Sequence, residues 1–147
     1  MLIIFSFVLH DIINIMTLFT KAILSPKSET DGLRISVMSR HTFNDGITPN
    51  PEISDDTYDE WIPELAPSLK LIGSYYRRGL SWDKFSESYE ATLHDDMRST
   101  IIQRIASRAL NENVTLMCIE ESPDRCHRRL LAEECKRIEA ELEVIIK

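Results

Sequence analysis

Reactive side chains are concentrated in one short stretch of the sequence, between residues 114 and 135. An apolar run, VTLMC, ends there in a cluster of polar and ionisable residues, and a helical pattern follows the cluster. In α/β proteins the ends of strands and the first turns of helices are the places that hold ligands. The cluster therefore predicts a functional site. Its members are Cys118, Glu120, Glu121, Cys126, His127 and Arg128.

The chemistry expected of Cys126 and His127 follows from their place near the start of the last predicted helix. Ser122 is a favoured N-cap and Pro123 a favoured first helical residue, which puts both side chains in the first turn. Unpaired N–H groups and the helix dipole lower the pKa of a thiol there and attract phosphate-like anions. We assign Cys126 and His127 as candidate catalytic residues, and Ser122 and Arg128 as ligand-binding residues. The alternative is that Cys126 fills the core and the arginines are solvated.

Cys118 and Glu120 would share one face if the strand continues past Cys118. A carboxylate at this position can act as a general base or bind a sugar hydroxyl, so Glu120 is a candidate catalytic residue. Cys118 is a candidate ligand-binding residue. A core cysteine followed by surface glutamates is an equally supported interpretation. Cys135 continues the apolar face of the helix with Leu131 and is expected in the core.

A second polar segment follows the predicted strand that ends near residue 39. If the two strands are parallel, both segments emerge at the same edge of the sheet, where α/β folds form ligand crevices. An arginine at position 40 can hold an oxyanion with two hydrogen bonds, and a histidine at position 41 can transfer protons near neutral pH. We assign His41 as candidate catalytic, and Ser39, Arg40 and Asp45 as ligand-binding. The alternative is a polar turn closed by Asp45-Gly46.

A metal site is not expected from the spacing. Cys118, Cys126, His127 and Cys135 carry suitable atoms. Structural zinc sites favour paired ligands two to four residues apart, and adjacent Cys and His side chains rarely reach one ion. A phosphatase-type loop needs a glycine-rich cradle, and this loop has no glycine. We therefore predict neither a metal nor another cofactor.

Short strands and amphipathic helices are expected to position these residues. Apolar and β-branched runs predict strands near residues 18–24, 34–39, 114–119 and 142–146. Apolar spacing predicts helices near 58–65, 69–77, 82–93, 97–110 and 122–141. Strands that alternate with helices require crossover connections. We predict an α/β three-layer sandwich with a mostly parallel central sheet flanked by helices, without a readable strand order. Aromatic residues between the strands are expected to pack in the core rather than stack on a base, namely Trp61, Tyr75, Tyr76 and Trp82.

The length, charge and cysteine content of the chain indicate how many domains it has, which partners it can bind and where it is located. The chain has 147 residues and a net charge of −7, which suits one domain and argues against a broad nucleic-acid surface. Three cysteines without a CxxC pair favour a reducing, cytoplasmic location. The apolar segment 1–15 has neither the basic start of a signal peptide nor the length of a membrane span. We expect translation to start at Met16, with a single domain over 16–147. The alternative is that residues 1–15 add a strand or helix to that domain.

Two blocks of the sequence resemble the family called domain of unknown function 488. One runs from ISVMSRHTFNDG through LAPS to the W..F...Y pattern of residues 82–89, and the other is VTLMCIEESPDRCHRRLLAEEC. The likeness covers roughly residue 18 to the C-terminus. It implies a site but no reaction, because the family has no settled activity. The pattern C-x-E-x-x-P-x-x-C-H-R-x-L-L-A is carried by Cys118, Glu120, Pro123, Cys126, His127, Arg128, Leu130, Leu131 and Ala132.

Two functional hypotheses follow from these residues. The first is an enzyme that acts on a small phosphorylated or nucleotide-like substrate, whose anion is held by Arg40, Arg128 and the start of the last helix. The second is a non-catalytic module that binds a nucleotide or a nucleic-acid end in the same pocket. A redox or metal sensor is a third interpretation, and it requires the cysteines to lie close together.

Overall fold

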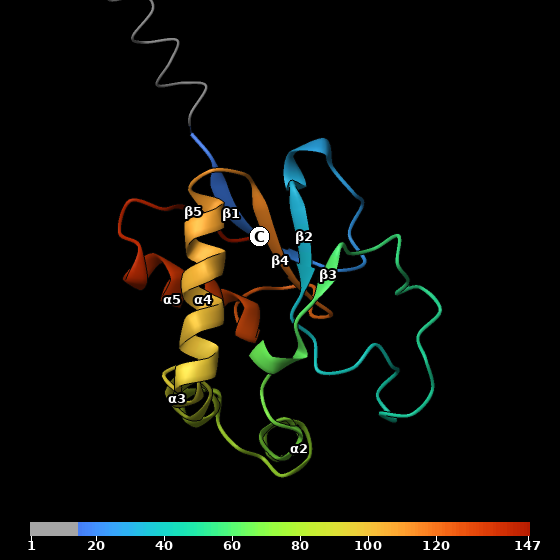
Figure 1. Ribbon diagram of the computed structural model, residues 1–147. Coiled ribbons are helices and arrows are strands. Elements are labelled where there is room, and N and C mark those ends of the chain that lie inside the picture. Colours follow the sequence, from blue (N-terminus) through green and yellow to red (C-terminus); the bar gives the residue numbers. More distant parts are fainter. Residues whose placement is uncertain (1–14) are drawn as a thin grey trace, which may run out of the picture.

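The fold is built around a parallel sheet. The computed structural model describes residues 15–147, so the expectations for the first fourteen residues lie outside the described part. All neighbouring strands pair in parallel, in the order β3-β2-β4-β1-β5 (Figure 1). The predicted α/β fold with a parallel central sheet is confirmed. The strands are β1 (Thr17–Ala22), β2 (Leu33–Ser36), β3 (Glu60–Trp61), β4 (Val114–Cys118) and β5 (Glu143–Ile145).

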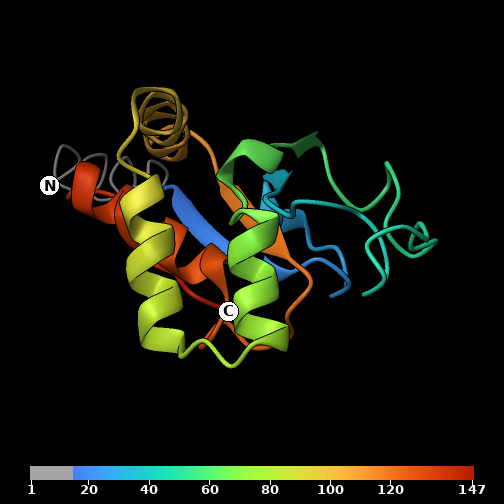
Figure 2. The same ribbon diagram turned by 90° about the horizontal axis from the view of Figure 1, so that it is seen from below.

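Four helices pack on this sheet, and three of them begin at an ordinary polar cap. Ser68, Ser81 and Asp95 each accept a hydrogen bond from the backbone N–H three residues later, which satisfies one of the free donors of the helix start. Figure 2 shows α2 and α3 side by side, joined by a short turn. The predicted helices near 69–77, 82–93 and 97–110 are confirmed. The helices are α2 (Leu69–Arg77), α3 (Trp82–Thr92), α4 (Asp96–Ala109) and α5 (His127–Ile138).

The two faces of the sheet are covered by different structures. Alternate residues of β4 point to opposite faces. Leu116 joins the main core, which also contains buried residues of α3, α4 and α5. Met117 joins a second cluster with Ile23 and Ile53, which come from the segments after β1 and β2. On this face Thr115 donates a hydrogen bond of 2.7 Å to the carbonyl of Asp31, in the short 3-10 helix η1 (Glu29–Asp31).

Two predicted elements were wrong in type or position. The helix predicted near 58–65 is instead the edge strand β3 followed by the 3-10 helix η2 (Pro63–Leu65), because Glu60 and Trp61 pair with β2. The last helix begins at His127 and not at Ser122. Residues 122–126 form a turn in which Ser122 Oγ accepts from the N–H of Asp124, so Ser122 caps this turn rather than the helix.

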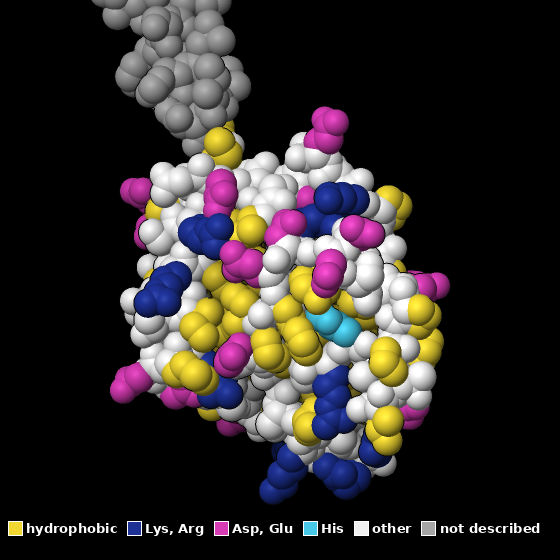
Figure 3. Space-filling view, turned by 45° about the vertical axis from the view of Figure 1, so that its right-hand side comes forward, with side chains coloured by type: hydrophobic (Ala, Val, Ile, Leu, Met, Phe, Trp, Pro, Cys, Tyr) yellow, Lys and Arg dark blue, Asp and Glu magenta, His cyan; other side chains and the backbone are white. Residues whose placement is uncertain are grey.

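Several large hydrophobic side chains lie exposed on the surface instead of in the core. Figure 3 shows such side chains gathered in the middle of one face, with a histidine side chain among them. Within residues 15–147, no helix combines the length and apolar character needed to cross a bilayer. The exposed large hydrophobic residues include Phe43, Ile47, Trp61, Leu69, Tyr76 and Met97.

Candidate functional site

The ends of two neighbouring strands meet the start of a helix at one edge of the sheet. β2 and β4 are adjacent, with Ser36 paired to Met117, and the N–H of Val37 donates to the carbonyl of Met117. Cys118 is the last residue of β4. The chain then turns through residues 119–126 and starts α5 at His127. The polar segment that follows β2 is thereby placed beside β4, the strand that leads into the cluster of residues 118–128.

Three ligand-type side chains converge at this point and form the Cys–Cys–His group, defined as Cys118, Cys126 and His127. Their sulfur and ring nitrogen atoms all lie within 4.8 Å of one another. The exposed fractions are 6%, 2% and 8%, so the group is covered by protein. Cys126 is the N-cap of α5 and has extended torsion angles (φ −132°, ψ 138°), whereas His127 is already helical. We attribute the convergence of these adjacent side chains to this change of backbone conformation.

The hydrogen bonds of His127 define its neutral tautomer. Nε2 lies 2.8 Å from the carbonyl oxygen of Val37. A carbonyl only accepts hydrogen bonds, so Nε2 carries the proton. In the neutral ring Nδ1 then presents its lone pair, and it lies 3.8 Å from Sγ of Cys118. The imidazole is thus oriented by the backbone after β2 and directs an electron pair at the thiols. The ring of Tyr89 packs edge-on against it, with 5.5 Å between centroids.

The two thiols have pKa values shifted in opposite directions. The hydrogen bond from Cys126 lowers the pKa of Cys118, helped by the N–H groups of Ile119 and Glu120 and by the charge of Arg128. The pKa of Cys126 is raised, because its thiol donates to Cys118 and is buried. The lowered pKa predicted for Cys126 was therefore wrong. The sequence located the helix start but not the partner thiol that holds the proton on Cys126.

Arg128 is fully buried and binds main-chain oxygen atoms rather than a side-chain carboxylate. Its guanidinium donates to the carbonyls of Glu120, Glu121 and Lys147 at 2.6, 3.3 and 3.1 Å. This places a positive charge beneath the loop that leaves β4 and ties that loop to the chain end. Its predicted role in ligand binding stays a prediction.

Glu120 and Ser122 lie in the turn that leads from β4 to α5. The hydroxyl of Tyr76 in α2 donates a hydrogen bond to the carboxylate of Glu120. Burial and this carboxylate raise the pKa of Tyr76. Sequence reasoning placed Tyr76 in the core, although its side chain is exposed and bound to Glu120. The spacing of apolar residues along the chain cannot predict such a contact, because the two residues are 44 positions apart.

The segment that follows β2 folds back on itself. Arg40 is exposed and donates a hydrogen bond of 2.8 Å to the carbonyl of Gly46. Asp45 accepts from two backbone N–H groups and from the hydroxyl of Thr48, and these bonds lower its pKa. The polar turn weighed as the alternative therefore exists. Ser39 is half-buried at the exit from β2.

His41 lies beside β2, against two aromatic rings. Its Nε2 lies 2.8 Å from Oγ of Ser36, and its ring packs against Tyr58 and Trp61 at 4.8 and 4.2 Å between centroids. Burial lowers its pKa, which favours the neutral ring. Trp61 is held in turn by a bond from its indole N–H to the carbonyl of Met38. One of these rings, Tyr58, also packs against the second core cluster, which contains Cys118 and Cys126.

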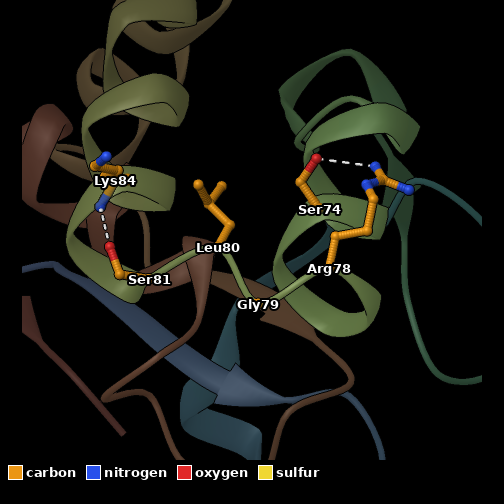
Figure 4. A pocket seen from close by; sticks show the side chains of 6 residues that line it. All are labelled: Ser74, Arg78, Gly79, Leu80, Ser81 and Lys84. Atoms are coloured by element: carbon orange, nitrogen blue, oxygen red, sulfur yellow. Dashed lines mark hydrogen bonds between the residues drawn. The ribbon is translucent and has the colours of Figure 1, made fainter.

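Two surface cavities among residues 15–147 are lined by residues other than the predicted ones. One of about 460 Å³ lies where α2 ends and α3 begins (Figure 4). The guanidinium of Arg78 there is bound to Ser74 and to the carbonyl of Lys70, and the Ser81 hydroxyl is occupied as the cap of α3. A second of about 300 Å³, beside the end of β1, is lined by residues that include Lys27, Arg34 and Glu52.

Fold and site together define an α/β protein with a buried Cys–Cys–His group at the carboxyl edge of a parallel sheet. The chain belongs to the DUF488 family: the model described as "Active DUF488-N3 subclade" matches residues 18–138. The resemblance found in the sequence is thereby confirmed. The chain is also similar to "Uncharacterized protein YeaO" of Escherichia coli (strain K12), with 26% identity over 119 residues, which is 80% of this chain and 96% of that protein. No solved structure matches the chain.

Proposed function

We propose that this chain is an enzyme whose active centre is the Cys–Cys–His group and whose substrate is a small anion of phosphorylated or nucleotide-like type. One observation carries the proposal, the hydrogen bond of 2.8 Å between His127 and the carbonyl of Val37. It joins the exit from β2 to the start of α5. These are the two regions in which the sequence places its reactive residues.

The position in the fold supports a ligand at this edge. Parallel strands bind ligands beyond their carboxyl ends, where connections leave toward opposite faces. After β1 the chain covers the face that carries Met117, and after β4 it returns along α5 on the face that carries Leu116. Cys126 makes no side-chain hydrogen bond as N-cap, so the first N–H groups of α5 have no side-chain cap and remain suited to an anion.

The side chains supply the acid–base chemistry of such an enzyme. His127 has a lone pair on Nδ1 directed at Cys118, which suits proton transfer within the pair. Glu120 stands next to the group and is held by Tyr76. The word "Active" in the description of the matching family model favours an enzyme over a remnant. Arg40 and His41 remain proposed contributors from the β2 side. Three free cysteines fit a reducing, cytoplasmic location.

Thermal unfolding with phosphate, sulfate and mononucleotides tests the proposal. A ligand at 100 times its Kd should add about 2.7 kcal/mol to the free energy of unfolding of the wild type. The gain should disappear in His127→Gln. It should persist in His94→Gln, because the His94 side chain is 60% exposed and lies in another part of the fold. Failure of every ligand to stabilise the wild type, or equal stabilisation of His127→Gln, would contradict the proposal.

A non-catalytic binding module is the second candidate, and the exposed and self-contained Arg40 loop favours it. Product analysis after incubation with each stabilising ligand separates the two. The enzyme predicts conversion by the wild type that is lost in Cys118→Ser. Tight binding without conversion by the wild type would assign the module.

A further inference from the structure

We propose that Cys118, Cys126 and His127 bind one zinc-class divalent cation through two sulfur atoms and Nδ1, and leave a fourth coordination position for water or substrate. The binding of the ion does not require the proposed function. An ion on Nδ1 and both sulfur atoms would replace proton transfer between His127 and Cys118 and leave Glu120 as the acid–base group. The use of the fourth position rests on that function, because it presumes a substrate at the same edge of the sheet.

The distances are close to those of a metal site. Tetrahedral zinc with Zn–S of about 2.3 Å and Zn–N of about 2.0–2.1 Å keeps its ligand atoms about 3.5–3.8 Å apart. Sγ of Cys118 and Nδ1 of His127 are 3.8 Å apart. The remaining separations are at most 4.8 Å. Closing the group around an ion therefore requires movements of about 1 Å or less, which small side-chain rotations provide.

The imidazole is already arranged as in metal-binding histidines. Such residues donate the second ring N–H to a carbonyl or carboxylate, which fixes the tautomer and raises the basicity of the ligating nitrogen. His127 donates from Nε2 to the carbonyl of Val37. The other ring nitrogen, Nδ1, lies on the side of the sulfur atoms, 3.8 Å from Sγ of Cys118. The ring of Tyr89 restricts the rotation of the imidazole further.

The charges of the ligands also suit a divalent cation. Two thiolates balance one divalent cation, so the loaded group is neutral, as a buried site requires. The buried guanidinium of Arg128 donates to main-chain oxygen atoms and to no side-chain carboxylate.

The number of ligands distinguishes a reactive site from a structural one. The group found among residues 15–147 has three members, and Cys135 lies in the main core instead. Structural zinc sites have four protein ligands, whereas catalytic sites have three and keep one open position. Two sulfurs and one imidazole nitrogen are among the ligand sets used for catalysis. The sequence spacing argued against a metal because it assumed that Cys126 and His127 could not converge.

The test is a titration of the reduced, metal-free full-length protein with Co²⁺, followed by Zn²⁺. We expect one equivalent of Co²⁺ to produce thiolate-to-metal charge-transfer absorption with tetrahedral d–d bands, and one equivalent of Zn²⁺ to remove them. A wild type that gives no saturable charge-transfer band would overturn the inference. This result does not depend on how any variant folds.

Two variants assign the ligands. Cys126→Ser should lower the Zn²⁺ affinity by at least about 100-fold and weaken the charge-transfer band. Serine is a favoured N-cap, so this variant keeps the start of α5. Cys135→Ser is the matched control and should bind like the wild type. Equal loss in both variants, or no loss in Cys126→Ser, would overturn the assignment.

The outcomes separate this inference from the proposed function. If the protein binds the metal but no anion stabilises it, the metal site is supported and the proposed anionic substrate is rejected. Anion binding and turnover by protein that binds no metal keep the function and reject the metal site. If an added anion shifts the Co²⁺ bands, the anion binds at the fourth coordination position. If the anion binds and the bands do not change, the fourth position does not bind the substrate.

Discussion

Arg128 is a buried cation whose partners are main-chain oxygen atoms. Its three bonds hold the turn that carries Glu120 and Glu121 and also the last residue of the chain. Removing a buried side chain of this kind leaves carbonyl groups without donors and opens a cavity. The residue is therefore expected to contribute to stability as well as to the electrostatics of Cys118.

Substitution of Arg128 by alanine is expected to lower the free energy of unfolding by about 3–5 kcal/mol. Arg137→Ala serves as the control. Arg137 is exposed and pairs with Glu134 on the surface of α5, so its loss is expected to change the free energy of unfolding very little. Urea denaturation measures the free energy of unfolding of both variants. A similar small loss in the two variants would show that the buried guanidinium adds nothing to the fold.

At the level of elements, the connection between β1 and β2 depends on close contact with the segment before β4. Asn113 accepts from the N–H of Thr17 through its side chain and from the N–H of Leu33 through its carbonyl. Gly32 adopts φ +63°, and a Cβ there would lie 2.0 Å from that carbonyl oxygen. The absence of a side chain thus allows three strands to start side by side.

Gly32→Ala is expected to destabilise the protein by more than about 2 kcal/mol, because backbone must move in addition to the strain of a positive φ. Gly79→Ala is the matched control. Gly79 has φ +73° but nothing within 4 Å of an added Cβ, so only the strain of about 1–2 kcal/mol applies. Thermal or urea unfolding compares them, and equal losses would contradict the steric explanation.

At the scale of the whole molecule, stability in acid depends on the ion pairs of one buried carboxylate, that of Asp31. Asp31 pairs with Lys21 of β1 and with Arg34 of β2, and it accepts from the N–H of Ser28. Burial raises the pKa of Asp31, but the bonds from Ser28 and Lys21 and the charges of Lys21 and Arg34 outweigh it, and the pKa is lowered from 3.8. The ionised carboxylate therefore stabilises the folded state.

Because the folded-state pKa of Asp31 lies below the unfolded value, this contribution is complete above the unfolded pKa of 3.8 and disappears as the pH falls through the folded pKa. Asp31→Asn should lower the free energy of unfolding by about 1–3 kcal/mol at pH 7, and the difference from the wild type should shrink below pH of about 4. Asp55→Asn, in an exposed loop, is the control. A difference that stays constant between pH 7 and pH 3 would contradict this role.

The local patterns of the sequence determined much of the fold. Alternating and β-branched runs located β1, β2, β4 and β5, and apolar spacing with polar caps located α2, α3 and α4. These features depend on neighbours within a few residues, so they can be read without the rest of the chain. The pattern C-x-E-x-x-P-x-x-C-H-R located the candidate site in the same way.

The tertiary structure alone decided the strand order and the partners of each reactive group. The bond between His127 and Val37 spans 90 positions, and it determines which ring nitrogen is free. The proximity of Cys118 and Cys126 reverses the pKa expected for Cys126. Such contacts depend on how β2, β4 and α5 lie in space, and a pattern read along the chain carries no information about distances between remote residues.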